Sequence, residues 1–331
     1  MAATVAAPPR SRRLRALSRN QGAIIAGVIL LVLLVVYQYQ AGRVLSVIQV
    51  RILLNGALAL VWASIGLAFV VVAGGFDLSV GSVMSLANVL AATLLAGTSS
   101  DPLVIAAILL VGALAGLANG FLIAVVRIQS IIVTLAAMFI WSGLALLIMP
   151  QPGGVIPVYL ADVTGGSAAG IPVALVWLIG ILGAIAVFRQ SSAWNVLFAV
   201  GGDEVGARRS GVRVTRGKLL AYAAAGGCYA TAGLFLSAQT TGGDANIGTP
   251  FLLTSFAAVI LGGTPLGGGR GTFVGAVLGA LVVAMLGSVL LSLGVTSYWT
   301  DVVQGTVLIL AVVLPILVTR AARRRAARGV R

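Results

Sequence analysis

Long stretches without a charged residue fill this chain and decide what it can fold into. Ten of them separate the charged positions: 20–42, 52–76, 78–100, 102–126, 128–161, 163–188, 219–243, 245–269, 271–300 and 302–319. All but 245–269 contain enough apolar residues for the roughly 20-residue helix that crosses about 30 Å of hydrocarbon. Lipid offers the backbone no hydrogen-bond partners, so such stretches must be helical. The sequence predicts an all-α polytopic membrane protein with about ten transmembrane helices, some of them broken.

Composition removes most other classes of protein. Only 8% of the residues are charged, against about 25% in soluble domains. The chain has no histidine and one cysteine, Cys228, so no disulfide framework is possible and the commonest metal ligand is missing. No nucleophile motif is present, and the nearest match to a phosphate loop, 211–219, has Leu219 where Ser or Thr should bind magnesium. We expect a subunit without catalytic residues, metal or cofactor, and a partner that uses any Mg-ATP.

The distribution of basic residues predicts how the chain sits in the membrane. With the N-terminus in the cytoplasm, ten spans place 19 of the 21 basic residues inside and leave only Arg43 and Arg51 outside. The net charge of +14 therefore indicates topology and not nucleic-acid binding. The predicted organisation is a basic cytoplasmic tail (1–19), a membrane domain (20–319) with a cytoplasmic segment at 189–218, and a second basic cytoplasmic tail (320–331). The loop 150–170, without helical periodicity, is expected outside.

Two glycine-rich segments interrupt the apolar runs. In the first, 74–81, both Asp77 and Ser79 are good N-cap residues for a helix that starts at Val80. It is read either as an ordinary tight turn with a capping aspartate at the cytoplasmic face or as a helix break at membrane level. The second, 262–271, follows the apolar run 251–261, which is too short to span alone. Paired broken helices point to transport sites in other transporters.

Polar side chains within the predicted spans are candidates for lining a pathway. Polar groups are costly in lipid, so they should face protein or water, and hydrogen bonding between helices is the favoured explanation for any single one of them. The polar candidates are Asn55, Trp62, Asn88, Asn119 and Gln239, and the pathway prediction also includes Phe76 and Asp77 of the first glycine-rich segment. As a set they suit a polar, uncharged solute, and the lack of central charges argues against a secondary transporter. Glycines at 112, 116 and 120 and at 271, 275 and 279 predict close helix packing.

The segment 189–218 is the longest polar stretch between the spans. Asp203 or Gly202 could cap a short helix ending near Gly211. The plain alternative is a solvated loop that carries topological charge. Small residues and both signs of charge also suit docking on a protein partner.

Five ordered motifs resemble the monosaccharide-type permeases of bacterial ABC importers. They are G-G-F-D-L-S-V-G-S (74–82), Asn119–Gly120 followed by I-V-T-L (132–135), 199–212, 257–272 and S-Y-W (297–299). Gln129–Ser130 and Pro265 depart from the usual pattern. The resemblance covers about residues 45–315.

This resemblance implies an importer of the bacterial plasma (inner) membrane. Its partners would be ABC ATPase subunits, a second permease copy or a paralogue, an extracytoplasmic sugar-binding protein and membrane lipid. Nucleosides or another small polar solute are the alternative substrates. The implied ATPase-coupling residues are Gly201, Gly202, Asp203, Glu204, Ala207, Arg208, Ser210 and Gly211. We expect small residues such as Ala207 to seat the segment in a cleft of the ATPase, with charged residues at its rim.

Overall fold

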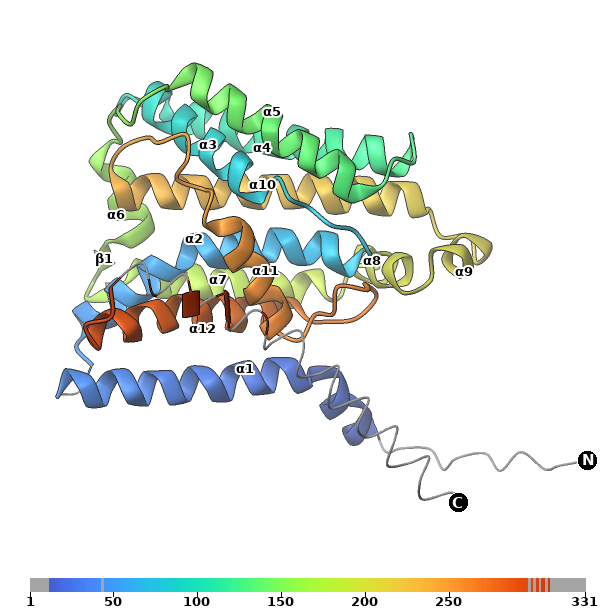
Figure 1. Cartoon of the computed structure of the whole chain (residues 1–331), viewed down its shortest axis with the longest axis horizontal. Coiled ribbons are helices and arrows are strands. Elements are labelled where there is room, and N and C mark those ends of the chain that lie inside the picture. Colours follow the sequence, from blue (N-terminus) through green and yellow to red (C-terminus); the bar gives the residue numbers. More distant parts are fainter. Residues whose placement is uncertain are drawn as a thin grey trace, which may run out of the picture.

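The computed structural model describes residues 12–42 and 45–296 and, between 299 and 309, residues 299, 302, 303, 305, 306 and 309. Within this part the regular secondary-structure elements are all helices apart from a hairpin of β1 (Ser167–Ala168) and β2 (Ile171–Pro172) (Figure 1). Most of the predicted span 302–319 and of the N-terminal tail, Arg43, and all of the tail 320–331 lie outside the described residues. The prediction of an all-α membrane protein is confirmed.

Six described helices are long and apolar enough to cross a membrane. They are α1 (Arg12–Ala41), α2 (Val47–Val72), α4 (Asp101–Ala124), α5 (Ser130–Ile148), α10 (Val214–Thr240) and α12 (Phe273–Ser292). A seventh span results if α7 (Val173–Phe188) and α8 (Ser192–Gly202), bent by 78°, count as one. The predicted spans 78–100 and 245–269 contain the short helices α3 (Val80–Leu94) and α11 (Phe251–Leu261). Length and composition therefore do not reproduce the count of about ten.

The stretch 150–170, where we expected no helix, contains α6 (Val158–Gly165) as well as β1. Pro157 stands immediately before this helix, and Leu160 and Thr164 are buried. A helix of eight residues is marginally stable on its own, and packing against α10 stabilises this one. Local periodicity in the sequence does not reveal such a tertiary contact.

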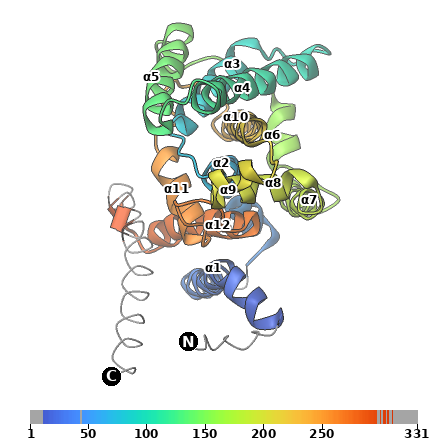
Figure 2. The same cartoon turned by 90° about the vertical axis from the view of Figure 1, so that its right-hand side faces the viewer.

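The bundle is built around α2 and α10, which pack on each other. Viewed end-on, α10 lies between α4 and α2, while α12 and α11 cover the other side of α2 and α1 lies outside α12 (Figure 2). Close packing of α4 on α10 depends on the predicted glycines. A Cβ at Gly112 or Gly116 would collide with the α10 backbone at Gly226 or Tyr222. A Cβ at Gly275 or Gly279 of α12 would likewise collide with the backbone at the C-terminal end of α11.

The two ends of the bundle differ in the charged residues that they carry. The end formed by α8, α9 (Glu204–Arg209) and the α4–α5 connection, here called the basic end, carries Arg127, Arg208, Arg209 and Lys218 around one cavity. The opposite end carries α6 and β1 (Figure 1). The long helices run between these ends, so each interruption of a helix can be placed relative to them.

Candidate functional site

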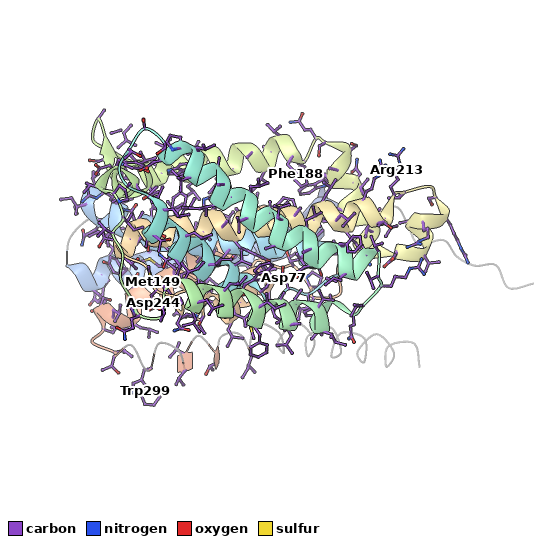
Figure 3. All side chains as sticks on the ribbon, turned by 90° about the horizontal axis from the view of Figure 1, so that it is seen from above. Asp77, Met149, Phe188, Arg213, Asp244 and Trp299 are labelled. Carbon is purple, nitrogen blue, oxygen red and sulfur yellow. The ribbon has the colours of Figure 1, made fainter. Side chains whose placement is uncertain are left out.

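The first predicted interruption is a buried break in the helical structure. Seven residues, 73–79, separate α2 from α3 without helical structure, and Asp77 among them is fully buried. Asp77 lies between the end marked by Met149 and Asp244 and the end marked by Arg213 (Figure 3). The interpretation as an ordinary turn at an exposed face is therefore wrong, and a break within the bundle is observed.

Asp77 does not cap α3. Its Oδ1 accepts hydrogen bonds from the Ser79 backbone N–H at 2.9 Å and from the Ser79 hydroxyl at 2.6 Å. Ser79 holds the N-cap position, but its side chain makes no capping bond. The second carboxylate oxygen, Oδ2, has no hydrogen-bond partner among the described residues. Asp77 therefore fixes the shape of the break rather than the end of the helix.

Three other helices hold the break in place. From α5, the Ser130 hydroxyl accepts from the Phe76 N–H at 3.3 Å, and from α10 the Tyr222 hydroxyl donates to the Phe76 carbonyl at 3.0 Å. From α4, Asn119 Nδ2 donates to the Ser79 hydroxyl oxygen at 3.1 Å. Non-helical backbone survives at membrane depth only where protein or water pairs its polar groups, and these contacts provide that pairing.

The two short helices meet at their N-terminal ends. Gly81 of α3 and Gly248, just before α11, lie so close that a Cβ on either would collide with the carbonyl oxygen of the other. The Ser85 hydroxyl accepts from the Gly248 N–H at 2.9 Å, and Phe76 stacks on Phe256 with ring centroids 6.3 Å apart. Paired broken helices are thus present. The start of α3 contacts the segment before α11, whereas 262–271 contacts the start of the first break at Gly74.

The remaining pathway candidates lie elsewhere. Gln239 Nε2 donates to the Asn55 carbonyl at 2.8 Å, and Asn55 Nδ2 donates to the Gly165 carbonyl at 2.7 Å. Asn55 lies about 25 Å along α2 from its C-terminal end at Val72. The candidates therefore form two groups, Asn55 with Gln239 near the opposite end and Phe76, Asp77 and Asn119 at the break.

Trp62 and Asn88 join neither group. Half-buried Trp62 lies beside Phe235, with ring centroids 6.4 Å apart, and its indole N–H has no partner among the described residues. Buried Asn88 donates to the Ser237 hydroxyl and the Gly242 carbonyl and accepts from the Asp244 N–H. This side chain fixes the segment that leads to α11, as the structural alternative proposed.

Sequence reasoning missed two tyrosines of α10. Tyr222 and Tyr229 are fully buried, and Tyr222 holds the break through its hydroxyl. The Tyr229 hydroxyl is a neighbour of Asp77 but has no hydrogen-bond partner among the described residues. Two tyrosines seven residues apart in an apolar run were the available signal, because a buried hydroxyl normally requires a partner.

At the basic end, α9 forms the short helix that the sequence predicted. Asp203 caps it by accepting from the Gly206 N–H at 3.0 Å. Lys218 donates to Glu204 and Arg208 forms an ion pair with the same carboxylate at 3.3 Å. The Lys218 contact, more than any other, holds the pKa of Glu204 below its usual value.

The free face of α9 differs from the expected one. Ala207 is buried against Val200 and Val214, so it faces its own chain and cannot seat the helix in a partner. Val205, which we did not single out, is 60% exposed. Of the implied coupling residues, those that are exposed are Gly202, Asp203, Arg208, Ser210 and Gly211.

Glycines join α9 to the break. Gly201 and Gly202 at the end of α8 lie against Gly268 and Gly269, and Gly268 lies against Gly74 at the start of the break. The Gly269 N–H donates to the Val72 carbonyl at 2.9 Å. A Cβ on Gly201 would collide with that same carbonyl oxygen. We call these five glycines the glycine junction; through it three segments that are distant in sequence touch backbone to backbone.

Known proteins resemble this chain over most of its length. The family described as "Branched-chain amino acid transport system / permease component" matches residues 49–312. The ribose import permease protein RbsC of Escherichia coli K12 is 33% identical over 257 residues, 76% of this chain and 80% of that protein. RbsC of Bacillus subtilis is 33% identical over 80% and 82%. The autoinducer 2 import system permease protein LsrC of Escherichia coli SMS-3-5 is 32% identical over 89% and 87%. No solved structure matches the chain.

Proposed function

The chain belongs to the branched-chain amino acid transport system / permease component family, and we propose that it is the permease subunit of an ATP-driven sugar importer. Its substrate is a monosaccharide or a similar small polyhydroxylated solute. The names of the relatives support this choice, since one group imports ribose and another imports autoinducer 2. The hydrogen-bonding side chains around the break, Asp77, Ser79 and Asn119, suit a solute that carries hydroxyl groups.

The backbone contact between the end of α8, which leads directly into α9, and the start of the break is the observation that carries this proposal. An importer powered by a separate ATPase must pass movement from a soluble partner to the membrane pathway. Here an exposed, capped helix is joined through the glycine junction to the start of the break. Because this contact runs from backbone to backbone, displacement of α9 is transmitted without flexible side chains in between.

The proposed arrangement in the membrane has ten passes. Two of them are the broken passes 73–94 and 241–261, each made of a non-helical stretch and a short helix, and the last is 302–319. The basic end faces the cytoplasm, so both tails and the segment 189–218 are cytoplasmic and 150–170 is outside. The protein lies in the bacterial plasma membrane, with a membrane domain at 20–319 between the two basic tails.

The proposed partners supply what this chain lacks. ABC ATPase subunits bind α9 and hydrolyse Mg-ATP, a second permease copy or a paralogue completes the pathway, and an extracytoplasmic binding protein delivers the sugar. This chain contributes no catalytic residue and binds no cofactor. Nucleosides are the alternative cargo, and a thermal-shift screen of the cognate binding protein against ribose, other pentoses and nucleosides separates them.

The test is uptake of labelled ribose into proteoliposomes that contain the permease with its cognate ATPase and binding protein. We expect uptake that requires ATP on the ATPase side. Val205→Asp should remove an apolar contact from the exposed face of α9 and abolish both ATPase co-purification and uptake. Arg208→Ala, which removes one exposed charge, should do much less. Uptake driven by an ion gradient without ATP would show that the protein is a secondary transporter.

A further inference from the structure

A cavity of about 590 Å³ opens at the basic end beside α9. Its wall combines four parts of the chain: the start of the break, the α4–α5 connection, α9 and the first turns of α10. The volume lies in the range of small-molecule sites in proteins.

Positive charge converges on this cavity. Arg127, Arg208, Arg209 and Lys218 line it, against the single carboxylate of Glu204. Glu204 is already paired with Lys218 and Arg208. Neither Arg127 nor Arg209 forms an ion pair within the described part of the chain. Two guanidinium groups without a counter-ion in one concave site favour an anion that can accept several hydrogen bonds.

The backbone at Arg127 supports a role for its side chain. Arg127 has a φ of 66°, a left-handed conformation that glycine adopts freely and that side chains rarely adopt. The Ile128 N–H donates to the Leu122 carbonyl at 3.1 Å across this residue and closes the end of α4. Glycine would adopt this turn without the backbone cost, and here arginine occupies it at a position where its side chain lines the cavity.

The cavity also offers neutral donors and an apolar wall. Gln129 and Thr215 add polar side chains, while Ile123, Ile128 and Val205 form apolar surface. Outside the cavity, α5 continues with exposed Ile131 and Ile132. An anionic group with an apolar body would thus contact both kinds of surface.

We propose that this cavity binds a phosphate group, carried either by an anionic phospholipid headgroup or by a soluble phosphate compound. The bound phosphate accepts from Arg127 and Arg209 and so ties α9 to the α4–α5 connection. Basic pockets on the cytoplasmic side of membrane proteins hold lipid headgroups in this way. Binding itself does not depend on the proposed function; only an effect on coupling to an ATPase would rest on it.

The experiment uses the purified full chain and two sets of probes. Native mass spectrometry counts bound phosphatidylglycerol, with phosphatidylcholine as the uncharged comparison, and thermal unfolding is followed with inorganic phosphate and ribose 5-phosphate. We expect one phosphatidylglycerol to resist removal, or a soluble phosphate compound to raise the unfolding temperature. The first result identifies a lipid site and the second a soluble ligand.

Matched variants decide whether the cavity is responsible. Arg127→Gln with Arg209→Gln should weaken binding at least about tenfold through lost charge-assisted hydrogen bonds. Arg213→Gln with Arg216→Gln, which removes equal charge outside the cavity lining, should leave it unchanged. Arg127→Gly suits the left-handed backbone, so it should fold at least as well and still lose affinity. Equal weakening in the control pair, or no binding of any probe by the wild type, would overturn the proposal. So would loss of ATPase binding alone in the cavity variants.

Discussion

At the scale of single residues, the buried carboxylate of Asp77 defines the break. Its Oδ1 receives both donors of Ser79, and Asn119 reaches the same serine from α4. The motif predicted a cap, because Asp and Ser before a helix usually cap it. The structure uses the aspartate as an acceptor inside the break, and only tertiary contacts distinguish these two uses.

Substitutions at Asp77 distinguish its role as a hydrogen-bond acceptor from the effect of its negative charge. Asp77→Asn keeps an oxygen acceptor for both Ser79 donors and places an amide near the Tyr229 hydroxyl, so we expect assembly and uptake close to wild type. Asp77→Leu leaves both donors buried and unpaired, at a cost of about 1–3 kcal/mol each, and should lower thermal stability and uptake together. The readouts are the unfolding temperature in detergent and sugar uptake. Loss of uptake in a normally assembled Asp77→Asn variant would mean that the charge itself is needed.

At the scale of elements, the glycine junction links α9, the break and the segment after α11. Gly269 combines a φ of 67° with a position where a Cβ would collide with Gly202. Both the backbone conformation and the lack of space therefore exclude any other residue at this position. Gly267, two residues earlier, has open space where a Cβ would lie. The same glycine-rich segment therefore provides both a sensitive position and its control.

We expect Gly201→Ala and Gly269→Ala to separate α8 from the break and cost about 1–3 kcal/mol by overpacking. Both should reduce substrate-stimulated ATP hydrolysis while the ATPase still co-purifies, because the exposed face of α9 is unchanged. Gly267→Ala should behave as wild type. ATP hydrolysis that stays fully coupled in Gly201→Ala would show that movement reaches the membrane by another route.

At the scale of the whole molecule, the sequence predicted most of the architecture from lipid chemistry alone. Charge-free runs located the long helices, and α11 begins and ends where the apolar run does. Glycine spacing predicted that α4 packs closely against another helix, and the structure shows that this helix is α10. The pairing of α3 with the segment before α11 was not predictable, since Gly81 and Gly248 are far apart in sequence and no local pattern links them. The inward face of Ala207 was missed for the same reason: burial depends on Val200 and Val214 across α8 and α10.

At the same scale, the distribution of Lys and Arg predicts how the whole bundle is oriented in the membrane. Cytoplasmic segments retain Lys and Arg, so the basic end should face the cytoplasm and the end with α6 and β1 should face outward. Half-buried Cys228 is first replaced by serine. Single cysteines are then introduced in place of two exposed serines, Ser167 in β1 and Ser192 at the start of α8. Ser191 is avoided because its hydroxyl caps α8. A membrane-impermeant maleimide should label Ser167→Cys in intact cells and Ser192→Cys only after permeabilisation. The reverse pattern would invert the topology and place α9 where no cytoplasmic ATPase could reach it.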